Sequence, residues 1–344
     1  MPEHRLKKVT QTDLSESLIS PDKTFAAAVM PYVQIARIDH WFKNVFMLLG
    51  VLLALFYDPS SLELSQIPIL IVGLLVTCVV ASSNYVINEF LDGPLDRLHP
   101  TKKTRPAAQG LVELRFVLVE WLSLAAIGIF VAFQINIVFG FAALVFWMMG
   151  CLYNIRPIRL KDIPYLDVVS EAFNNPLRLL MGWSLLIPDR MPPVSLVFSF
   201  WFAAAFFMAT KRFAEYRKIN DPELAGLYRS SFRHYDAEKL LISMMYYVTF
   251  GALFIGIFIV RYKLELILCV PFVAGFFAYY LRLALEEDSP VQAPEKLYKN
   301  RGFLYYSIFC AVIFVTTMLI EIPVLYDFFN VEAARLEPLW RLHS

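Results

Sequence analysis

Three carboxylates and one amide lie close together at the end of a long apolar segment. Asn88, Glu89, Asp92 and Asp96 fall within one arc of about 100° when the segment is drawn as a helix. Carboxylate and amide oxygens gathered in this way are the ligands that Mg²⁺ prefers, with room left for water and phosphate oxygens. The pattern therefore predicts a magnesium site at the end of this helix.

Basic residues follow these carboxylates directly, at Lys102, Lys103 and Arg105. Lysine and arginine are the usual binders of phosphate groups in proteins. Metal ligands followed by cations, at the end of an apolar segment, indicate a membrane enzyme that acts on a diphosphate.

A second polar stripe interrupts the apolar segment at residues 166–187. Five of its side chains share one face of a helix, and these are Asp167, Glu171, Asn174, Asn175 and Arg178. An ionisable group near the centre of a membrane costs at least about 2.5 kcal/mol, so such groups normally face a cavity and carry a function. Asp167 and Glu171 are predicted as a second pair of metal ligands facing the first stripe. The alternative is a salt bridge between Arg178 and Glu171 within the helix.

Further polar groups lie at the ends of neighbouring apolar segments. They include Lys43, Tyr153, Arg156, Arg159, Lys161, Lys211, Arg212, Glu215 and Arg229. Each cation alone is compatible with a simple anchor at the membrane surface. Together with the carboxylates, they favour recognition of several phosphates.

The elements that must position these residues are transmembrane helices. Hydrophobic residues make up 58% of the 344 residues and charged residues 18%, which indicates an all-α polytopic membrane protein. Windows of roughly 17–25 apolar residues predict nine spans. These are 41–57, 67–90, 114–134, 136–153, 166–187, 194–213, 241–260, 264–285 and 302–328. The net charge of +1 gives no argument for a nucleic-acid partner.

The distribution of Lys and Arg predicts the orientation. Most of them lie in the N-terminal tail and in the loops after spans two, four, six and eight. Because positive loops stay in the cytoplasm, the N-terminus and the polar clusters are expected on the cytoplasmic side of a bacterial inner membrane. The expected organisation is a cytosolic tail over 1–36, a catalytic transmembrane domain over 37–330 and a short C-terminal tail over 331–344.

The two carboxylate motifs resemble those of the UbiA superfamily of intramembrane prenyltransferases. Asn88-Glu89-x-x-Asp92-x-x-x-Asp96 and Asp167-x-x-x-Glu171 are similar to its N-D-x-x-D-x-x-x-D and D-x-x-x-D motifs, with Glu89 and Glu171 in place of aspartates. Four stretches resemble the decaprenyl-phosphate phosphoribosyltransferase branch. They are Asp96-x-x-His99-Pro100-x-Lys102-x-x-Arg105-Pro106-x-Ala108-x-Gly110, Trp41-x-Lys43-Asn44, Lys161-x-x-Pro164-x-x-Asp167-Val168 and Lys211-Arg212-x-Ala214-Glu215.

The resemblance covers roughly residues 32–325 and implies a nine-helix UbiA-type bundle. It implies a Mg²⁺-dependent transfer of a phosphoribosyl group from phosphoribosyl pyrophosphate to a polyprenyl phosphate, as in cell envelope biosynthesis, with loss of pyrophosphate. The implied catalytic residues are Asp92, Asp96 and Asp167. The implied metal ligands are Asn88, Glu89, Asp92, Asp96, Asp167 and Glu171. The implied substrate-binding residues are Lys43, Lys102, Arg105, Tyr153, Lys161, Arg178 and Lys211.

Two other functions stay open. A UbiA-type enzyme could instead move an isoprenoid from a prenyl diphosphate to an aromatic acceptor, because metal-assisted loss of a diphosphate serves both reactions. A transporter could use polar spans as an ion path. The clustering of polar residues at one end of the spans argues against a transporter, whose site usually lies near the bilayer midplane.

Overall fold

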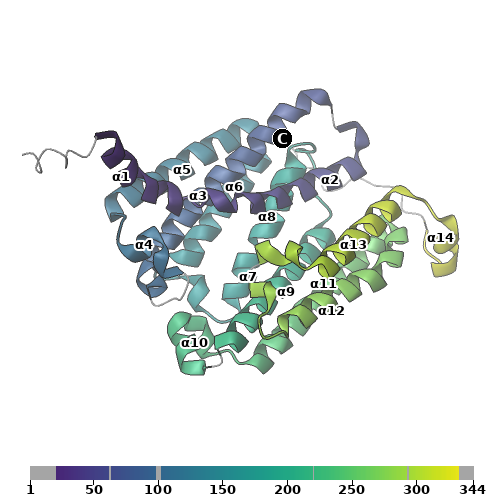
Figure 1. Ribbon diagram of the computed structural model, residues 1–344. Helices are drawn as coiled ribbons and strands as arrows, with labels where there is room; N and C mark the ends of the chain where they lie inside the picture. The colour runs from purple at the N-terminus through teal and green to yellow at the C-terminus, as the bar shows by residue number, and fades with distance from the viewer. Residues whose placement is uncertain (1–20, 62, 98–101, 220, 293, 333–344) are drawn as a thin grey trace, which may run out of the picture.

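Every regular element that the structure describes is a helix, as expected for an all-α membrane protein. The computed structural model describes residues 21–332 apart from positions 62, 98–101, 220 and 293 (Figure 1). Its helices are α1 (Pro21–Ile35), α2 (Met47–Tyr57), α3 (Ile67–Asp96), α4 (Pro106–Gln109), α5 (Leu114–Ile135), α6 (Ile137–Asn154), α7 (Leu166–Ala172), α8 (Asn174–Ser184), α9 (Val194–Ile219), α10 (Pro222–Tyr228), α11 (Ala237–Tyr262), α12 (Val270–Ala284), α13 (Arg301–Leu319) and α14 (Pro323–Phe329).

Eight helical segments among the described residues are long and apolar enough to cross a membrane. They are Ala27–Tyr57, Leu64–Asp96, Leu114–Ile135, Ile137–Asn154, Val194–Ile219, Ala237–Tyr262, Leu264–Ala284 and Arg301–Leu319. Residues 166–187, predicted as one span, form two short helices instead, because α7 ends and α8 begins on either side of Phe173. The first segment also begins earlier than predicted, since α1 occupies residues assigned to the N-terminal tail.

Polar caps fix where several of the membrane helices begin. The side-chain oxygens of Asn136, Asp236 and Asn300 accept hydrogen bonds from backbone N–H groups three residues further on, at 2.7, 2.7 and 3.0 Å. Such bonds satisfy N–H groups that the first turn of a helix leaves unpaired. They therefore mark the starts of α6, α11 and α13, and only α6 begins within otherwise apolar sequence.

The helices form two packed groups that meet at the α7–α8 junction. The largest core of the first group includes Met47 with residues of α3, α5, α6 and α8. The core of the second group joins α7 to α9, α11 and α12. Phe173 packs against the first core, while Val168 of α7 is part of the second. The second polar stripe consequently lies where the two groups meet.

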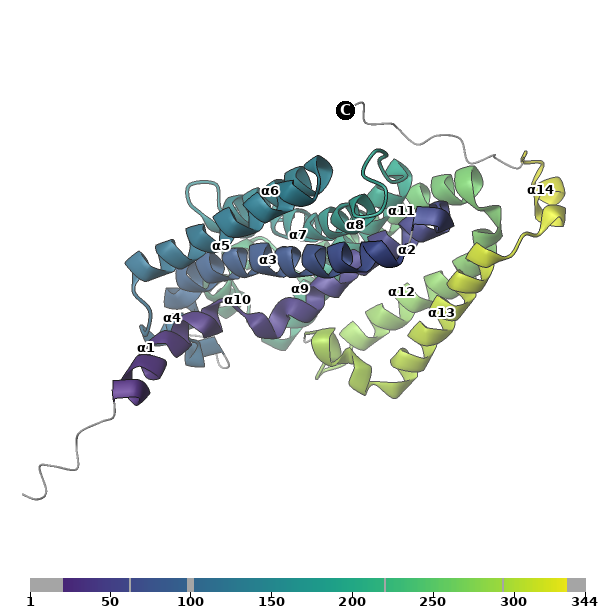
Figure 2. The ribbon, with the colours of Figure 1, turned by 90° about the horizontal axis from the view of Figure 1, so that it is seen from above.

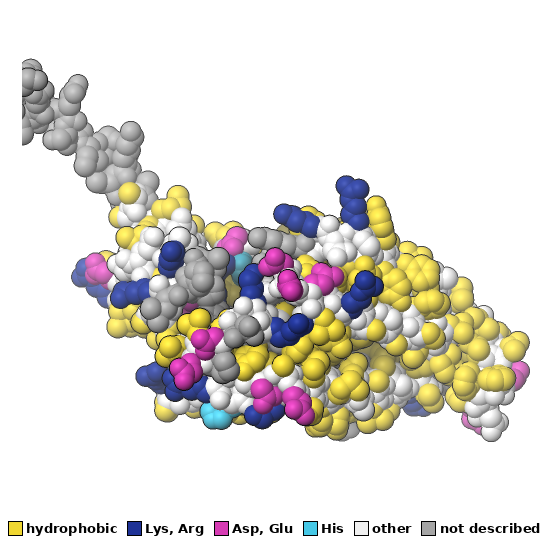
Figure 3. All heavy atoms as spheres, turned by 60° about the horizontal axis from the view of Figure 1, so that its bottom comes forward, with side chains coloured by type: hydrophobic (Ala, Val, Ile, Leu, Met, Phe, Trp, Pro, Cys, Tyr) yellow, Lys and Arg dark blue, Asp and Glu magenta, His cyan; other side chains and the backbone are white. Residues whose placement is uncertain are grey.

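Charged side chains gather toward one end of this bundle. Helices α4 and α10 lie at that end, while α14 lies at the opposite end in both ribbon views (Figures 1 and 2). Figure 3 shows basic and acidic side chains crowded over part of one face and a mainly apolar surface over the rest. The orientation of this charged end relative to the cytoplasm stays a prediction.

Candidate functional site

The first predicted motif forms a column of oxygens along the last turns of α3. The Asn88 amide nitrogen donates to Asn154 Oδ1. Oδ1 of Asp92 accepts from Arg159 at 3.0 Å and from Lys161 at 2.5 Å. Oδ2 of Asp96 accepts from Arg105 at 2.8 Å. The two aspartates are thus each neutralised by cations from the loops that follow α3 and α6.

These contacts leave one oxygen of each residue in the column without a protein donor in the described part of the chain. The oxygens are Asn88 Oδ1, Asp92 Oδ2 and Asp96 Oδ1. They recur every fourth residue and so share one face of α3. Hard, partly open oxygens of this kind fit Mg²⁺. The described residues hold no ready-made group of three His, Cys, Asp or Glu side chains around one metal position.

Glu89 lies apart from this column. Its side chain is almost fully buried and its Oε2 lies 3.8 Å from the guanidinium of Arg37. Its Oε1 is buried without a hydrogen-bond partner in the described structure. Around the helix Glu89 is about 100° from Asn88 but only about 20° from Asp96, so its burial and its contact with Arg37, not its angle, set it apart. Its predicted role as a metal ligand stays a prediction.

Asp167, the first carboxylate of the second stripe, is fully buried and surrounded by donors. Oδ1 accepts from the Tyr235 hydroxyl at 2.6 Å, and Oδ2 accepts from Ser231 Oγ at 3.1 Å. Arg212 and Arg229 lie 3.5 and 3.6 Å from Oδ2. Asp167 therefore ties α7 to α9 and to the segment before α11. Both oxygens of Asp167 thus already have protein partners, and its role as a metal ligand stays a prediction.

Glu171, by contrast, is partly open, with 38% of its side chain exposed. Its Oε2 accepts from the Tyr153 hydroxyl at 2.7 Å and from Arg212 at 3.3 Å. No donor in the described structure contacts its Oε1. Glu171 is thus the carboxylate of the second stripe that is better placed to reach a bound cation or ligand. The alternative salt bridge between Arg178 and Glu171 is not formed, because Arg178 donates to Asn44 at 2.9 Å.

The end of α6 brings the two motifs together. Asn154 contacts Asn88 and also accepts from Lys161 at 2.9 Å, while the adjacent Tyr153 contacts Glu171. Burial lowers the pKa of Lys161 to about 8, although the nearby Asp92 carboxylate acts in the opposite direction. Lys161 thus stays largely protonated at pH 7 while being nearly withdrawn from water.

Lys102 approaches the site from the loop after α3. Burial lowers its pKa below the ordinary value, while the charges of Asp96 and Glu215 oppose that change. Glu215 lies on α9 and pairs with Arg212 at 3.2 Å. Lys102 is therefore near carboxylates from both groups of helices. His99, which belongs to the same predicted motif, lies outside the described residues.

The remaining two predicted substrate-binding residues are less directly tied to the carboxylates. Lys211 lies on α9, close enough for its charge to act on Glu171 and Glu215. Lys43 lies on the 3₁₀ segment η2 (Ile38–Phe46), with its ammonium 6.0 Å from the centre of the Phe42 ring. Both positions stay predictions as substrate contacts.

Sequence reasoning did not single out Asn154, Ser231 and Tyr235 as site residues. Ser231 and Tyr235 reach Asp167 from more than 60 residues further along the chain. Their types and spacing carry no distinct signal in the sequence. Asn154 follows Tyr153 at the end of a predicted span. Its polar side chain at that position could have marked it as a site residue.

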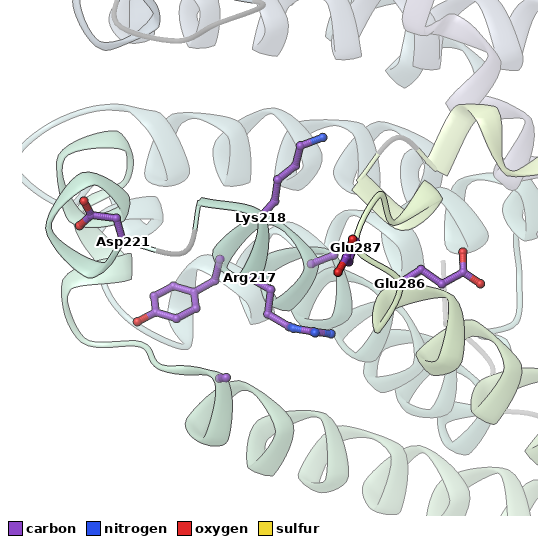
Figure 4. Close-up of a pocket in the computed structure, with 8 residues that line it drawn as sticks. Arg217, Lys218, Asp221, Glu286 and Glu287 are labelled. Atoms are coloured by element: carbon purple, nitrogen blue, oxygen red, sulfur yellow. The ribbon is translucent and has the colours of Figure 1, made fainter.

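A separate pocket of about 610 Å³ lies beside the ends of α9 and α12 (Figure 4). The charged residues around it are Arg217, Lys218, Asp221, Glu286 and Glu287. None of the predicted site residues lines it. We therefore place the candidate site at the two carboxylate motifs.

Comparisons with known proteins identify the family of the chain. Residues 44–320 match the family model described as the UbiA prenyltransferase family. A decaprenyl-phosphate phosphoribosyltransferase of Corynebacterium glutamicum is 26% identical over 53% of this chain and 54% of its own length. A protoheme IX farnesyltransferase of Macrococcus caseolyticus is 26% identical over 52% of this chain and 58% of its own length.

The alignments with curated relatives are partial. The chain covers only 32%, 27% and 29% of the lengths of the first three relatives that it matches. Most of the fold is nevertheless shared with a solved structure, that of a UbiA homolog from Archaeoglobus fulgidus bound to DMAPP and Mg²⁺. It is 20% identical with a TM-score of 0.63, covering 84% of this chain and 99% of that one. Since the family model spans most of the sequence and both motifs, the chain belongs to the UbiA prenyltransferase family.

Proposed function

We propose that this protein is a Mg²⁺-dependent membrane transferase that moves a phosphoribosyl group from phosphoribosyl pyrophosphate to a polyprenyl phosphate, releasing pyrophosphate. The observation that carries the proposal is the number of buried or half-buried cations around the carboxylates. They are Lys102, Arg105, Arg159, Lys161, Arg212 and Arg229. Phosphoribosyl pyrophosphate carries a diphosphate and a separate 5-phosphate, so it can use more cations than a prenyl diphosphate can.

The proposed metal ligands are Asn88, Asp92 and Asp96, with Glu171 approaching from the second stripe. When bound there, Mg²⁺ would supply positive charge to the diphosphate that leaves. Asp92 and Asp96 would then exchange their present contacts with Lys161, Arg159 and Arg105 for the metal. The released cations would be free to bind phosphate oxygens. Asp167, whose oxygens are both occupied, would position Arg212 rather than bind the metal directly.

The reaction needs orientation and charge stabilisation more than a strong base. The bond between the anomeric carbon and the diphosphate oxygen breaks, and a bond from that carbon to an acceptor phosphate oxygen forms. The acceptor phosphate is already anionic, so no side chain has to remove a proton from it. Protonated Lys161 and the guanidinium of Arg159 would stabilise the charge that develops on the leaving pyrophosphate.

The location proposed for this reaction is the cytoplasmic face of a bacterial inner membrane. A charged donor reaches the polar end of the bundle from water, while the acceptor keeps its chain in the bilayer. The distribution of Lys and Arg between alternate loops supports this orientation.

The second candidate is transfer of an isoprenoid from a prenyl diphosphate to an aromatic acceptor. It is favoured by the similarity to a protoheme IX farnesyltransferase and by the DMAPP and Mg²⁺ bound in the structural neighbour. The same column of oxygens on α3 would serve it.

A donor competition distinguishes the two. The full-length protein in lipid nanodiscs with Mg²⁺ would receive phosphoribosyl pyrophosphate with decaprenyl phosphate, or a prenyl diphosphate with 4-hydroxybenzoate. Mass spectrometry of the lipid products would identify the transferred group. We expect a phosphoribosylated lipid that disappears when Mg²⁺ is chelated. A prenylated aromatic product would instead assign the second candidate, and product from neither pair would contradict both.

A further inference from the structure

Arg178 is a cation inside the bundle whose contacts are all with neutral groups. It lies on α8 and only 8% of it is exposed. Its Nε donates to Asn44 Oδ1 at 2.9 Å and its Nη1 donates to the Asn174 carbonyl at 3.3 Å. The guanidinium also lies over the Phe146 ring, 4.8 Å from its centre. Its Nη2 has no hydrogen-bond acceptor within the described residues.

The other buried cations of the site differ from Arg178 in one respect. Arg159 and Lys161 pair with Asp92, and Arg212 pairs with Glu171 and Glu215. No carboxylate in the described structure lies within ion-pair distance of Arg178. Glu171 is close enough for its charge to act on Arg178, but its bonded oxygen contacts Tyr153 and Arg212. An unbalanced charge at this depth is costly, and an anionic ligand would balance it.

The position of Arg178 indicates from which side that anion arrives. Arg178 follows Glu171 by seven residues and lies on α8, across the α7–α8 junction from Glu171. Its contacts are the Asn44 amide oxygen, the Asn174 carbonyl and the Phe146 ring. A highly charged soluble donor would meet the cations of the charged end first. An anion carried on a hydrocarbon chain would approach Arg178 from the bilayer instead.

Close helix packing holds Arg178 and Asn44 in place. A Cβ built at Gly182 would lie 1.9 Å from the Met47 carbonyl oxygen, and one at Gly50 would lie 2.0 Å from the Leu179 carbonyl oxygen. Only glycine allows α2 and α8 to approach so closely. The Arg178–Asn44 pair is thus preorganised by the backbone, which lowers the entropic cost of binding a ligand.

We propose that Arg178, held by Asn44, binds the phosphate of the membrane-dissolved acceptor. This inference rests on the proposed function and assigns one of its two substrates to a defined residue. Arg178 would supply Nη2 and its uncompensated charge to the acceptor phosphate. The cations of the charged end would be left for the phosphates of the donor.

The test measures binding without any donor or metal, so its result is independent of which donor the enzyme uses. Wild-type protein and the variants Arg178→Gln, Arg178→Lys and Asn44→Asp would be titrated in nanodiscs with decaprenyl phosphate, decaprenol and 4-hydroxybenzoate. Native mass spectrometry would report occupancy. Arg115→Gln, which removes an exposed arginine at the start of α5, is the matched control. Asn44→Asp keeps the acceptor for Arg178 but supplies an internal negative charge that competes with the ligand.

We expect the wild type to prefer decaprenyl phosphate over decaprenol by about 10- to 100-fold, the size of one charge-assisted contact. The preference should fall to near unity in Arg178→Gln and Asn44→Asp, be partly kept in Arg178→Lys and be unchanged in Arg115→Gln. Loss of phosphate preference in Asn44→Asp without loss of thermal stability separates ligand binding from a purely structural role.

Three outcomes would overturn the inference. One is a wild type that does not prefer the phosphate over the alcohol. Another is a preference that survives in both Arg178→Gln and Asn44→Asp. The third is a loss confined to 4-hydroxybenzoate, which would assign Arg178 to a carboxylate acceptor. Failure of the proposed function would appear elsewhere, as the absence of phosphoribosylated lipid in the donor competition.

Discussion

The charged end of the bundle and the Arg178 region handle buried charge in opposite ways. At the charged end, cations and carboxylates neutralise one another, as Lys161 does with Asp92 and Arg105 does with Asp96. Around Arg178 only neutral oxygens and an aromatic ring are in contact. We call Asp92, Asp96 and their cationic partners Arg105, Arg159 and Lys161 the balanced cluster. Such a cluster can exchange its internal partners for a metal and phosphates at little net cost. An unbalanced cation must gain its partner from a ligand.

Asp92 pairs with both Arg159 and Lys161 at the charged end. Its replacement should therefore have the largest effect on catalysis. Asp92→Asn removes the charge that a metal would need while keeping the side-chain shape. We expect kcat to fall about 10²- to 10³-fold, with a higher Mg²⁺ concentration required for half-maximal rate. Asp189→Asn, which changes a mostly exposed aspartate outside the site, is the control and should leave both values unchanged. Equal activity of the two variants would contradict a metal role for Asp92.

Lys161 tests whether the cations of the balanced cluster serve the donor. Lys161→Gln should lower kcat/KM for phosphoribosyl pyrophosphate about 10- to 100-fold, because a charged hydrogen bond to the leaving group is lost. Binding of decaprenyl phosphate should change little. Lys239→Gln, at an exposed position at the start of α11, provides the matched control. If acceptor binding falls as much as donor use, the two regions do not divide the substrates as proposed.

The apolar pattern predicted most of the helices but not the division of residues 166–187. A hydropathy window averages over Phe173, so it reports one span where α7 and α8 belong to different cores. The helical wheel likewise placed Glu171 and Arg178 on one face and suggested a salt bridge. It could not include Tyr153, Arg212 and Asn44, which come from other helices and take these side chains as partners.

The candidate site shows the same limit. The column of Asn88, Asp92 and Asp96 was predictable, because its members are on one helix and their spacing alone aligns them. The donors to Asp167 were not, because Ser231 and Tyr235 are brought to it by tertiary packing. Sequence periodicity indicates which groups share a helix face. It does not indicate which partners occupy their hydrogen-bonding atoms.

A change in the packing between α2 and α8 tests whether this packing holds Arg178 and Asn44 in place. Gly182→Ala adds a methyl group where the Met47 carbonyl oxygen leaves no space, so the helices must separate. We expect the free energy of unfolding to fall by about 1–3 kcal/mol. Affinity for decaprenyl phosphate should also fall, because Arg178 and Asn44 move apart. Gly256→Ala on α11 meets nothing within 4 Å and is the control, with stability unchanged or slightly raised. A Gly182→Ala variant with wild-type acceptor affinity would separate Arg178 from acceptor binding.

Replacement of Asp167 should have the smallest effect on catalysis. It tests whether Asp167 belongs to the balanced cluster. Both of its oxygens already accept from protein donors, so Asp167→Asn should keep part of this network while losing the charge beside Arg212 and Arg229. We expect a loss of about 1–3 kcal/mol in unfolding free energy, less than tenfold in kcat and no change in the Mg²⁺ requirement. Titration of activity with Mg²⁺ beside Asp92→Asn measures this directly. A shift in the Mg²⁺ requirement as large as that of Asp92→Asn would show that Asp167 releases a donor and joins the metal ligands. The balanced cluster would then extend from α3 across to α7, and its charges would exchange partners on both sides of the site.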